Sequence, residues 1–198
     1  MTRWKGVFSI THSRTACCAD FCLYGAAVVA MAIFVGMHAV VGQRALLATL
    51  GLGGFAAWSL MEYALHRFVL HGLQPFKGWH AAHHAQPTAR IGTPTVVSAG
   101  LIGFLVFGPA LWCLGSVGGT ALTLGVTAGY LSYAATHHAV HHWGSRPGAG
   151  AASNHARAWL RQRKVWHGLH HQRHATGTAP GHYGVSLSLW DKVFQTGD

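Results

Sequence analysis

Histidine is the residue type in this sequence whose abundance and spacing point most directly to chemistry. The 198-residue chain contains 17 histidines, and all of them except His12, His38 and His155 lie in four clusters or close behind the last cluster. The clustered residues are His66 and His71; His80, His83 and His84; His137, His138, His141 and His142; and His167, His170 and His171, followed by His174 and His182. Because imidazole is a common ligand of zinc, copper, iron and nickel, the clusters predict a metal site.

The spacing within the clusters is typical of ligands presented by helices. Positions i, i+3 and i+4 share one face of an α-helix, so each HxxHH motif is expected to present up to three imidazoles in one direction. His66 and His71 are separated by about 140° on a helix with 3.6 residues per turn, so they must either straddle a site or lie at a helix end. In the third cluster, two pairs are spaced i, i+4, and the spacing leaves open which pair is used: His137 with His141, or His138 with His142.

The number of candidate ligands predicts two metal ions. About ten clustered histidines exceed what one four- to six-coordinate ion can bind. Carboxylates can contribute little, because the sequence has only 4 acidic residues. Glu62 lies one helical turn before His66, so it either orients that imidazole by accepting a hydrogen bond or is simply a residue at a helix end.

The elements that must position these histidines are predicted to be membrane helices. Charged residues make up 9% of the chain and hydrophobic residues 51%, whereas a soluble domain typically has about 25% charged residues. Four uncharged stretches are long enough to cross a hydrocarbon core of about 30 Å; they cover residues 21–43, 45–65, 95–114 and 120–136. We therefore predict an all-α membrane protein with one domain over residues 1–198. It has four transmembrane helices in two hairpins and a histidine-rich helical cap, formed by residues 66–94 and 137–198, that holds a di-metal site.

The basic residues predict the orientation of these helices. The formal net charge is +10, and every Lys and Arg except Arg44 lies on one side of the predicted spans. Positive residues mark the cytoplasmic side, so we expect both termini and the metal site to be cytoplasmic, in a bacterial inner membrane. This distribution argues against nucleic-acid binding, for which a basic stripe on a polar domain is expected. A cytoplasmic helix is predicted after Asn154, which is a suitable N-cap residue.

Taken in order, the motifs resemble those of the fatty acid hydroxylase / sterol desaturase superfamily. The resemblance extends from Trp58 to Thr196 and includes Tyr133-Ala-Ala-Thr-His-His-Ala-Val-His-His-Trp-Gly144 and the segment from His182 to Thr196, which contains Trp190-Asp191 and Phe194. It implies the metal ligands His66, His71, His80, His83, His84, His137, His141, His167, His170 and His171, with His138, His142, His174 and His182 as further candidates. The short interval between His71 and His80 is similar to that of bacterial carotenoid hydroxylases. A Gly/Ala-rich insertion precedes the last cluster, and His182 stands where the family commonly has Asn.

The resemblance also implies an activity and its partners. The expected enzyme binds two iron ions, which zinc could replace, and uses O2 to hydroxylate or desaturate a C–H bond of a lipid from the bilayer, either a fatty acyl chain, a sterol-like molecule or a carotenoid. No electron-transfer domain is visible in the sequence, so we expect a separate donor such as a ferredoxin or a cytochrome b5-like protein with its reductase. A basic surface could dock such an acidic donor, or could merely reflect the positive-inside bias; it comprises Arg157, Arg161, Arg163, Lys164 and Arg173.

The alternative function is that of a histidine-rich membrane protein that binds or transports metal without oxygenase activity. A transport pathway requires ionisable residues within the spans. The predicted spans contain almost none, and the histidines gather at one side. This distribution favours a fixed site over a conduit.

Overall fold

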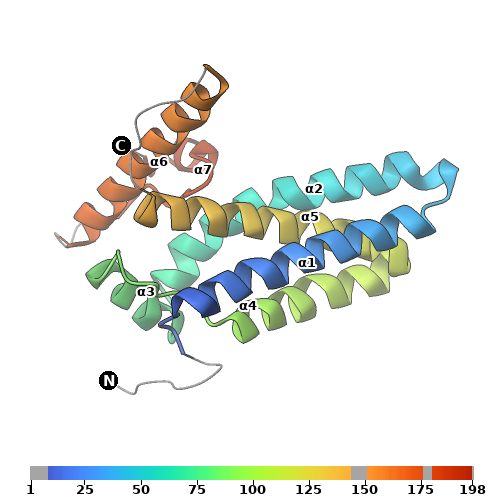
Figure 1. The fold of residues 1–198 in the computed structure, drawn as a ribbon, viewed down its shortest axis with the longest axis horizontal. Helices are drawn as coiled ribbons and strands as arrows, with labels where there is room; N and C mark the ends of the chain where they lie inside the picture. Colours follow the sequence, from blue (N-terminus) through green and yellow to red (C-terminus); the bar gives the residue numbers. More distant parts are fainter. Residues whose placement is uncertain (1–8, 144–150, 176–179, 198) are drawn as a thin grey trace. The chain divides into compact units, whose positions relative to one another are not determined.

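Helices form the regular structure of the part of the chain that the structure describes. The computed structural model describes residues 9–143, 151–175 and 180–197, and the side chains of residues 151–154 and 173–175 are not described. Within these ranges there is no strand, only an isolated antiparallel bridge between Thr11 and Ile91. The prediction of an all-α fold is confirmed for the described residues (Figure 1).

The helices follow one another in the chain with short connections. They are α1 (Arg14–His38), a 3-10 turn (Val41–Gln43), α2 (Arg44–Ala64), a π-helical turn (Leu65–Leu70), α3 (Phe76–Ala85), α4 (Thr95–Ile102), a second π-helical turn (Gly103–Phe107), α5 (Gly108–His142), α6 (Ala151–Ala175) and α7 (Leu189–Val193). Helix α1 begins earlier than predicted, because the Ser13 side chain accepts a hydrogen bond from the Ala16 amide and caps the helix. The predicted N-cap at Asn154 is wrong, since α6 already begins at Ala151.

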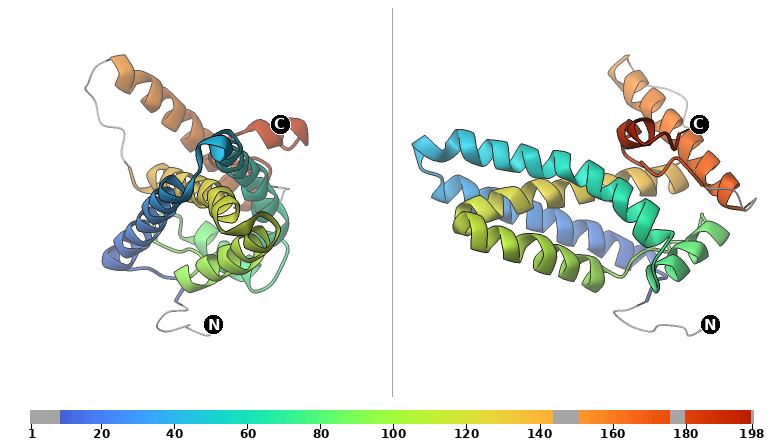
Figure 2. Two further views of the ribbon diagram at one scale, coloured as in Figure 1. Left: turned by 90° about the vertical axis from the view of Figure 1, so that its right-hand side faces the viewer. Right: turned by 180° about the vertical axis from the view of Figure 1, so that it is seen from behind.

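Three helical segments among the described residues are long and apolar enough to cross a membrane: Arg14–His38, Val41–Leu70 and Thr95–His142. The third contains 48 residues and covers both of the last two predicted spans. It is interrupted at Gly115, which has the non-helical angles φ 69° and ψ 178°, a conformation that glycine adopts more easily than other residues. Figure 2 shows the chain turning back on itself between α4 and the later part of α5.

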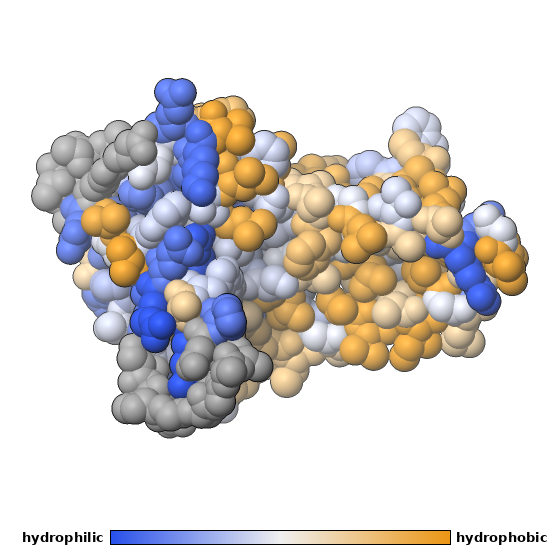
Figure 3. Space-filling view, turned by 90° about the horizontal axis from the view of Figure 1, so that it is seen from above, coloured by the Kyte–Doolittle hydropathy of each residue, from blue (hydrophilic) through white to orange (hydrophobic). Residues whose placement is uncertain are grey.

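The chain divides into two compact units. Unit 1 comprises Met1–Ser59 and Arg90–Leu131, and unit 2 comprises Leu60–Ala89 and Ser132–Asp198. Large hydrophobic side chains of unit 1 are exposed to the surroundings, among them Leu52 at 73% and Trp112 at 89%. Figure 3 shows hydrophobic side chains gathered over the helices of this unit on the face drawn. An apolar exterior of this kind is what lipid-facing helices require.

Glycines allow the backbones of α2 and α5 to touch within unit 1. A Cβ atom on Gly125 would lie 1.9 Å from the carbonyl oxygen of Gly51, and one on Gly54 would lie 2.3 Å from that of Leu122. Small residues at such crossings let membrane helices approach closely and gain van der Waals contact. The helix pair is therefore held by close packing that a larger side chain would prevent.

Replacing Gly125 by Ala is expected to destabilise unit 1. The added methyl group must displace the backbone of α2, and overpacking of this kind costs about 1–3 kcal/mol. Thermal unfolding in detergent would measure the effect as a lower melting temperature. Gly53→Ala is the matched control, since a Cβ atom there meets nothing within 4 Å. Equal melting temperatures for the two variants would contradict the close packing of α2 against α5.

Candidate metal centre

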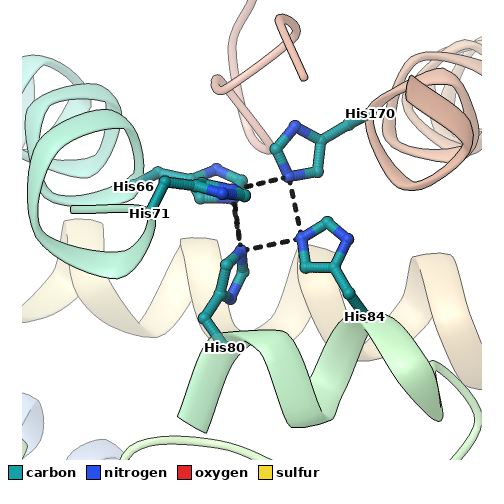
Figure 4. A group of neighbouring side chains, drawn as sticks. All are labelled: His66, His71, His80, His84 and His170. Atoms are coloured by element: carbon teal, nitrogen blue, oxygen red, sulfur yellow. Dashed lines mark hydrogen bonds between the residues drawn. The ribbon is translucent and has the colours of Figure 1, made fainter. Parts of the chain in front are cut away.

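Two groups of histidines in unit 2 are arranged so that each could hold a metal ion. We call His66, His71, His80, His84 and His170 the five-histidine group (Figure 4), and His83, His137, His141 and His167 the four-histidine group. In each group, one ring nitrogen per residue lies within 4.8 Å of all the others. The two groups contain every ligand that the family resemblance implied except His171.

Helices α3 and α6 each supply histidines to both groups. His83 and His84 are neighbours on α3 but belong to different groups, as do His167 and His170 on α6. The expectation that each HxxHH motif points in one direction is therefore wrong. The reason is geometric: on α3, positions i+3 and i+4 diverge by about 100° around the helix, and on α6 the division falls between positions i and i+3, which are about 60° apart.

The π-helical turn Leu65–Leu70 explains the unusual spacing of His66 and His71. In a π-helical turn the hydrogen bonds run i→i+5, so residues five positions apart point in more similar directions than they would on an α-helix. The two imidazole rings consequently lie 5.3 Å apart. His71 directly follows this turn, so the pair sits at a helix end, one of the two arrangements that the spacing left open.

The Nε2 atoms of the five-histidine group converge on one another. His80 Nε2 lies 3.0 Å from those of His66 and His84 and 3.1 Å from that of His71. His170 Nε2 lies 3.2 Å from His71 Nε2 and 3.1 Å from His84 Nε2. This convergence from three separate parts of the chain is drawn in Figure 4.

Backbone carbonyl groups fix the protonation of two of these rings. His66 Nδ1 lies 2.6 Å from the Tyr183 carbonyl oxygen, and His170 Nδ1 lies 2.6 Å from that of Gly181. A carbonyl oxygen can only accept, so each Nδ1 atom must carry the hydrogen and donate it. A neutral imidazole has a single N–H, which leaves a lone pair on Nε2 of both residues, directed into the group.

Hydrogen bonds alone cannot satisfy these nitrogens. Because Nε2 of His66 accepts, Nε2 of His80 must donate to it, and because Nε2 of His170 accepts, those of His71 and His84 must donate. His80 would then face two other donors at 3.0–3.1 Å. A cation bound by five lone pairs removes this conflict, so the donor set fits a metal ion.

The four-histidine group also brings imidazoles together and leaves ring nitrogens without hydrogen-bond partners among the described residues. His167 Nε2 lies 2.8 Å from His141 Nε2, and the His83 ring centre lies 4.8 Å from that of His137 and 4.7 Å from that of His141. Within the described part of the chain, both ring nitrogens of His83 are buried without a hydrogen-bond partner. Buried polar atoms are normally paired, and a metal ion would supply the missing partner.

Burial favours the neutral form of several of these imidazoles. Desolvation, reinforced by the neighbouring imidazoles, lowers the pKa of His83 to about 3. The same causes hold the pKa of His80, His167 and His170 well below the usual histidine value. Neutral rings are the form that binds metal, so at pH 7 these four residues need lose no proton before coordination.

Other candidate ligands lie outside the two groups. His171 Nε2 is 3.1 Å from His167 Nε2, and its ring stacks on His84 with centres 4.2 Å apart. His138 and His142 lie against each other instead, with ring centres 4.6 Å apart.

The last two candidates follow the fourth cluster. The His182 ring lies 5.4 Å from that of Trp166 and belongs to neither group. The side chain of His174 lies outside the described residues.

Glu62 does not bond to His66. Its carboxylate accepts hydrogen bonds from Ser186, from the amide at 2.8 Å and from the hydroxyl group. The Tyr183 carbonyl orients His66 instead. Sequence reasoning missed the contributions of Tyr183 and Gly181 because every residue has a carbonyl group, so these positions carry no signal of their own.

The proposed basic surface needs one correction. Arg163 is only 4% exposed; it donates to the Ser188 hydroxyl at 3.4 Å and lies over the ring of Trp166. It therefore cannot be part of an exposed docking surface. Arg161 is exposed on the same helix, whereas the side chain of Arg173 lies outside the described residues.

The chain is similar to known proteins. Residues 51–196 match the model of the fatty acid hydroxylase family. The chain is 31% identical over 156 residues to the fatty acid 2-hydroxylase of Homo sapiens, covering 73% of this chain and 38% of that protein. It is 30% identical over 158 residues to the dihydroceramide fatty acyl 2-hydroxylase FAH2 of Arabidopsis thaliana, covering 72% of this chain and 58% of that protein. The chain thus spans between about two fifths and three fifths of the length of these curated relatives.

A solved structure has a similar fold. The structure described as full-length scs7p, in which only the hydroxylase domain is visible, superposes with a TM-score of 0.72 and covers 90% of this chain and 65% of that one. The sequence identity is 21%, so this likeness concerns the fold alone.

Proposed function

The chain belongs to the fatty acid hydroxylase family, and on that premise we propose that it is a membrane enzyme that hydroxylates a fatty acyl chain with O2. The observation that carries the proposal is the convergence of imidazole nitrogens in two groups, five of whose nine rings are buried. The human and Arabidopsis relatives are named for 2-hydroxylation, which makes carbon 2 of the acyl chain the proposed position.

The reaction divides into what the metal ions supply and what the protein supplies. Two iron ions, when bound, would supply the redox chemistry that reduces O2. One oxygen atom enters the C–H bond and the other leaves as water, with two electrons and two protons taken up. The histidines contribute Nε2 lone pairs, and the carbonyl groups of Tyr183 and Gly181 hold two rings in the tautomer that presents those lone pairs.

The proposed electron donor is a separate acidic protein, a ferredoxin or a cytochrome b5-like protein with its reductase. The exposed side chain of Arg161 on α6 would face it. Opposite charges on two partners speed their encounter, and salt weakens the effect.

The proposed topology has four spans in two hairpins, with the metal centre and both termini in the cytoplasm. A straight helix of 48 residues would extend about 72 Å, far more than a hydrocarbon core of about 30 Å. The break at Gly115 supports two crossings instead. The basic residues, all but Arg44 on one side of the spans, support the orientation.

Labelled oxygen tests the proposed reaction. The purified, iron-loaded protein would be supplied with a reduced donor, ¹⁸O2 and a lipid carrying a saturated acyl chain, and the products analysed by mass spectrometry. We expect a 2-hydroxy acyl product that contains one ¹⁸O atom. A product that has lost two hydrogens without gaining ¹⁸O would show desaturation. Readily exchanged metal without any lipid turnover would overturn the proposal in favour of metal binding or transport.

A further inference from the structure

The C-terminal residues 181–196, here called the closing segment, are organised around one buried carboxylate. Asp191 is fully buried. Its Oδ1 atom accepts hydrogen bonds from the Tyr183 amide and the Thr196 hydroxyl group, and its Oδ2 atom accepts from the Gly184 amide, all at 2.8 Å. The Thr196 carbonyl in turn accepts from the His182 amide at 2.8 Å. One side chain therefore sets the path of the backbone through residues 182–184.

Two further contacts leave this backbone little freedom. A Cβ atom on Gly184 would lie 1.9 Å from the Leu187 carbonyl oxygen and 2.9 Å from Asp191 Oδ2, so the turn requires glycine. Glu62, one helical turn before His66, holds the amide and the hydroxyl group of Ser186. The closing segment is thus tied to the same part of the chain that carries a metal-ligand candidate.

This segment serves only one of the two histidine groups. It supplies the carbonyl groups that accept from His66 and His170, both in the five-histidine group. Among the described residues, no ring of the four-histidine group is hydrogen-bonded to it, and Nδ1 of both His83 and His167 has no hydrogen-bond partner at all. The two groups therefore differ in how their ligands are held, although their ligands are chemically alike.

We propose that Asp191 and Glu62 are positioning residues for the five-histidine group and not for the four-histidine group. Asp191 places the carbonyl groups that fix the tautomer and direction of His66 and His170, while Glu62 anchors the same segment from the helix that leads to His66. The inference rests on the proposed metal centre, but it does not depend on which lipid is hydroxylated. Partners that orient a ligand typically contribute 10–100-fold to metal affinity.

The decisive variants leave every histidine in place. Asp191→Asn keeps the size of the side chain but turns one acceptor into an NH2 donor that faces a backbone amide. Gly184→Ala displaces the same turn sterically. For both variants we expect one bound metal ion to be held about 10–100-fold more weakly, while the other is held as before. Asp20→Asn is the matched control, since this carboxylate lies in unit 1 and accepts from Thr95.

The measurement is a titration of the metal-free 198-residue chain with Co²⁺, followed by its visible absorption and by metal analysis. The parent and Asp20→Asn should each bind two ions with their original affinities. His170→Ala should lack the ion of the five-histidine group, so adding Asp191→Asn to it should change the binding of the remaining ion little. His83→Ala should lack the ion of the four-histidine group, so adding Asp191→Asn to it should weaken the one remaining site. These double variants assign the weakened ion to a group, which a general loss of stability would not do.

Other outcomes would overturn the inference. Equal weakening of both ions, or of neither, in Asp191→Asn and Gly184→Ala would contradict a role confined to one group. If those variants fail to fold, Ser186→Ala, which removes only the hydroxyl group held by Glu62, should still weaken one ion selectively. A parent protein that binds two ions but hydroxylates no lipid would refute the proposed function alone. Unchanged metal binding by the variants of an active enzyme would refute this inference alone.

Discussion

His170→Ala is expected to abolish lipid hydroxylation and to remove one of the two proposed metal ions. The side chain is fully buried, and its Nε2 atom lies among the other ligands, 3.1 Å from His84 and 3.2 Å from His71. The substitution removes a proposed ligand. It also removes the imidazole that donates a hydrogen bond to the Gly181 carbonyl oxygen. In the proposed function both iron ions together would supply the chemistry that reduces O2, so turnover should fall to background when one is lost.

Metal analysis and the ¹⁸O2 assay, applied to the same preparation, would measure both effects. His155→Ala is the control, because His155 is exposed on α6 and belongs to neither group. It should retain the metal content and activity of the parent. Equal losses in the two variants would contradict the assignment of ligands.

His141→Ala and His142→Ala are expected to behave oppositely, although the residues are adjacent. His141 Nε2 lies 2.8 Å from His167 Nε2, and its ring centre lies 4.7 Å from those of His83 and His137. The His142 ring packs against His138 instead. We therefore expect His141→Ala to lose one ion and all hydroxylation, and His142→Ala to keep two ions and most of the activity.

The same comparison tests which pair of the third cluster binds metal. Both variants remove one imidazole from the same end of α5, so general effects on folding should be similar in the two. Metal content measured after purification in parallel would separate them. The reverse pattern, with the ion lost only from His142→Ala, would assign the site to His138 and His142.

The fold class and the ligand candidates could be predicted from local patterns. Long uncharged stretches indicate membrane helices because a bilayer excludes charge. The third helical segment of the structure is interrupted at Gly115, between the predicted spans 95–114 and 120–136. The HxxHH motifs place imidazoles on helices because the helical period is regular. Scarcity of carboxylates left histidine as the principal candidate ligand, and the two groups contain histidine alone.

The division of these candidate ligands between two groups could not be predicted in this way. His83 and His84 are adjacent in the sequence, and only the positions of the facing helices determine that they serve different groups. The π-helical turn between His66 and His71 is likewise absent from a regular helical pattern. It changes the relative direction of the two rings, which an ideal α-helix would hold apart.

The contacts of charged residues and of backbone carbonyl groups also had to come from the tertiary structure. By itself, the sequence determined that this chain forms apolar helices and carries imidazoles at helical spacing, because both follow from the local period and polarity of neighbouring residues. Only the tertiary structure decided that Glu62 holds Ser186 instead of His66 and that Arg163 is buried. It also decided that the Tyr183 and Gly181 carbonyls orient His66 and His170. These contacts join residues more than ten positions apart, and many of them are made by backbone groups that every residue has. They therefore depend on where the chain folds back and not on its local pattern.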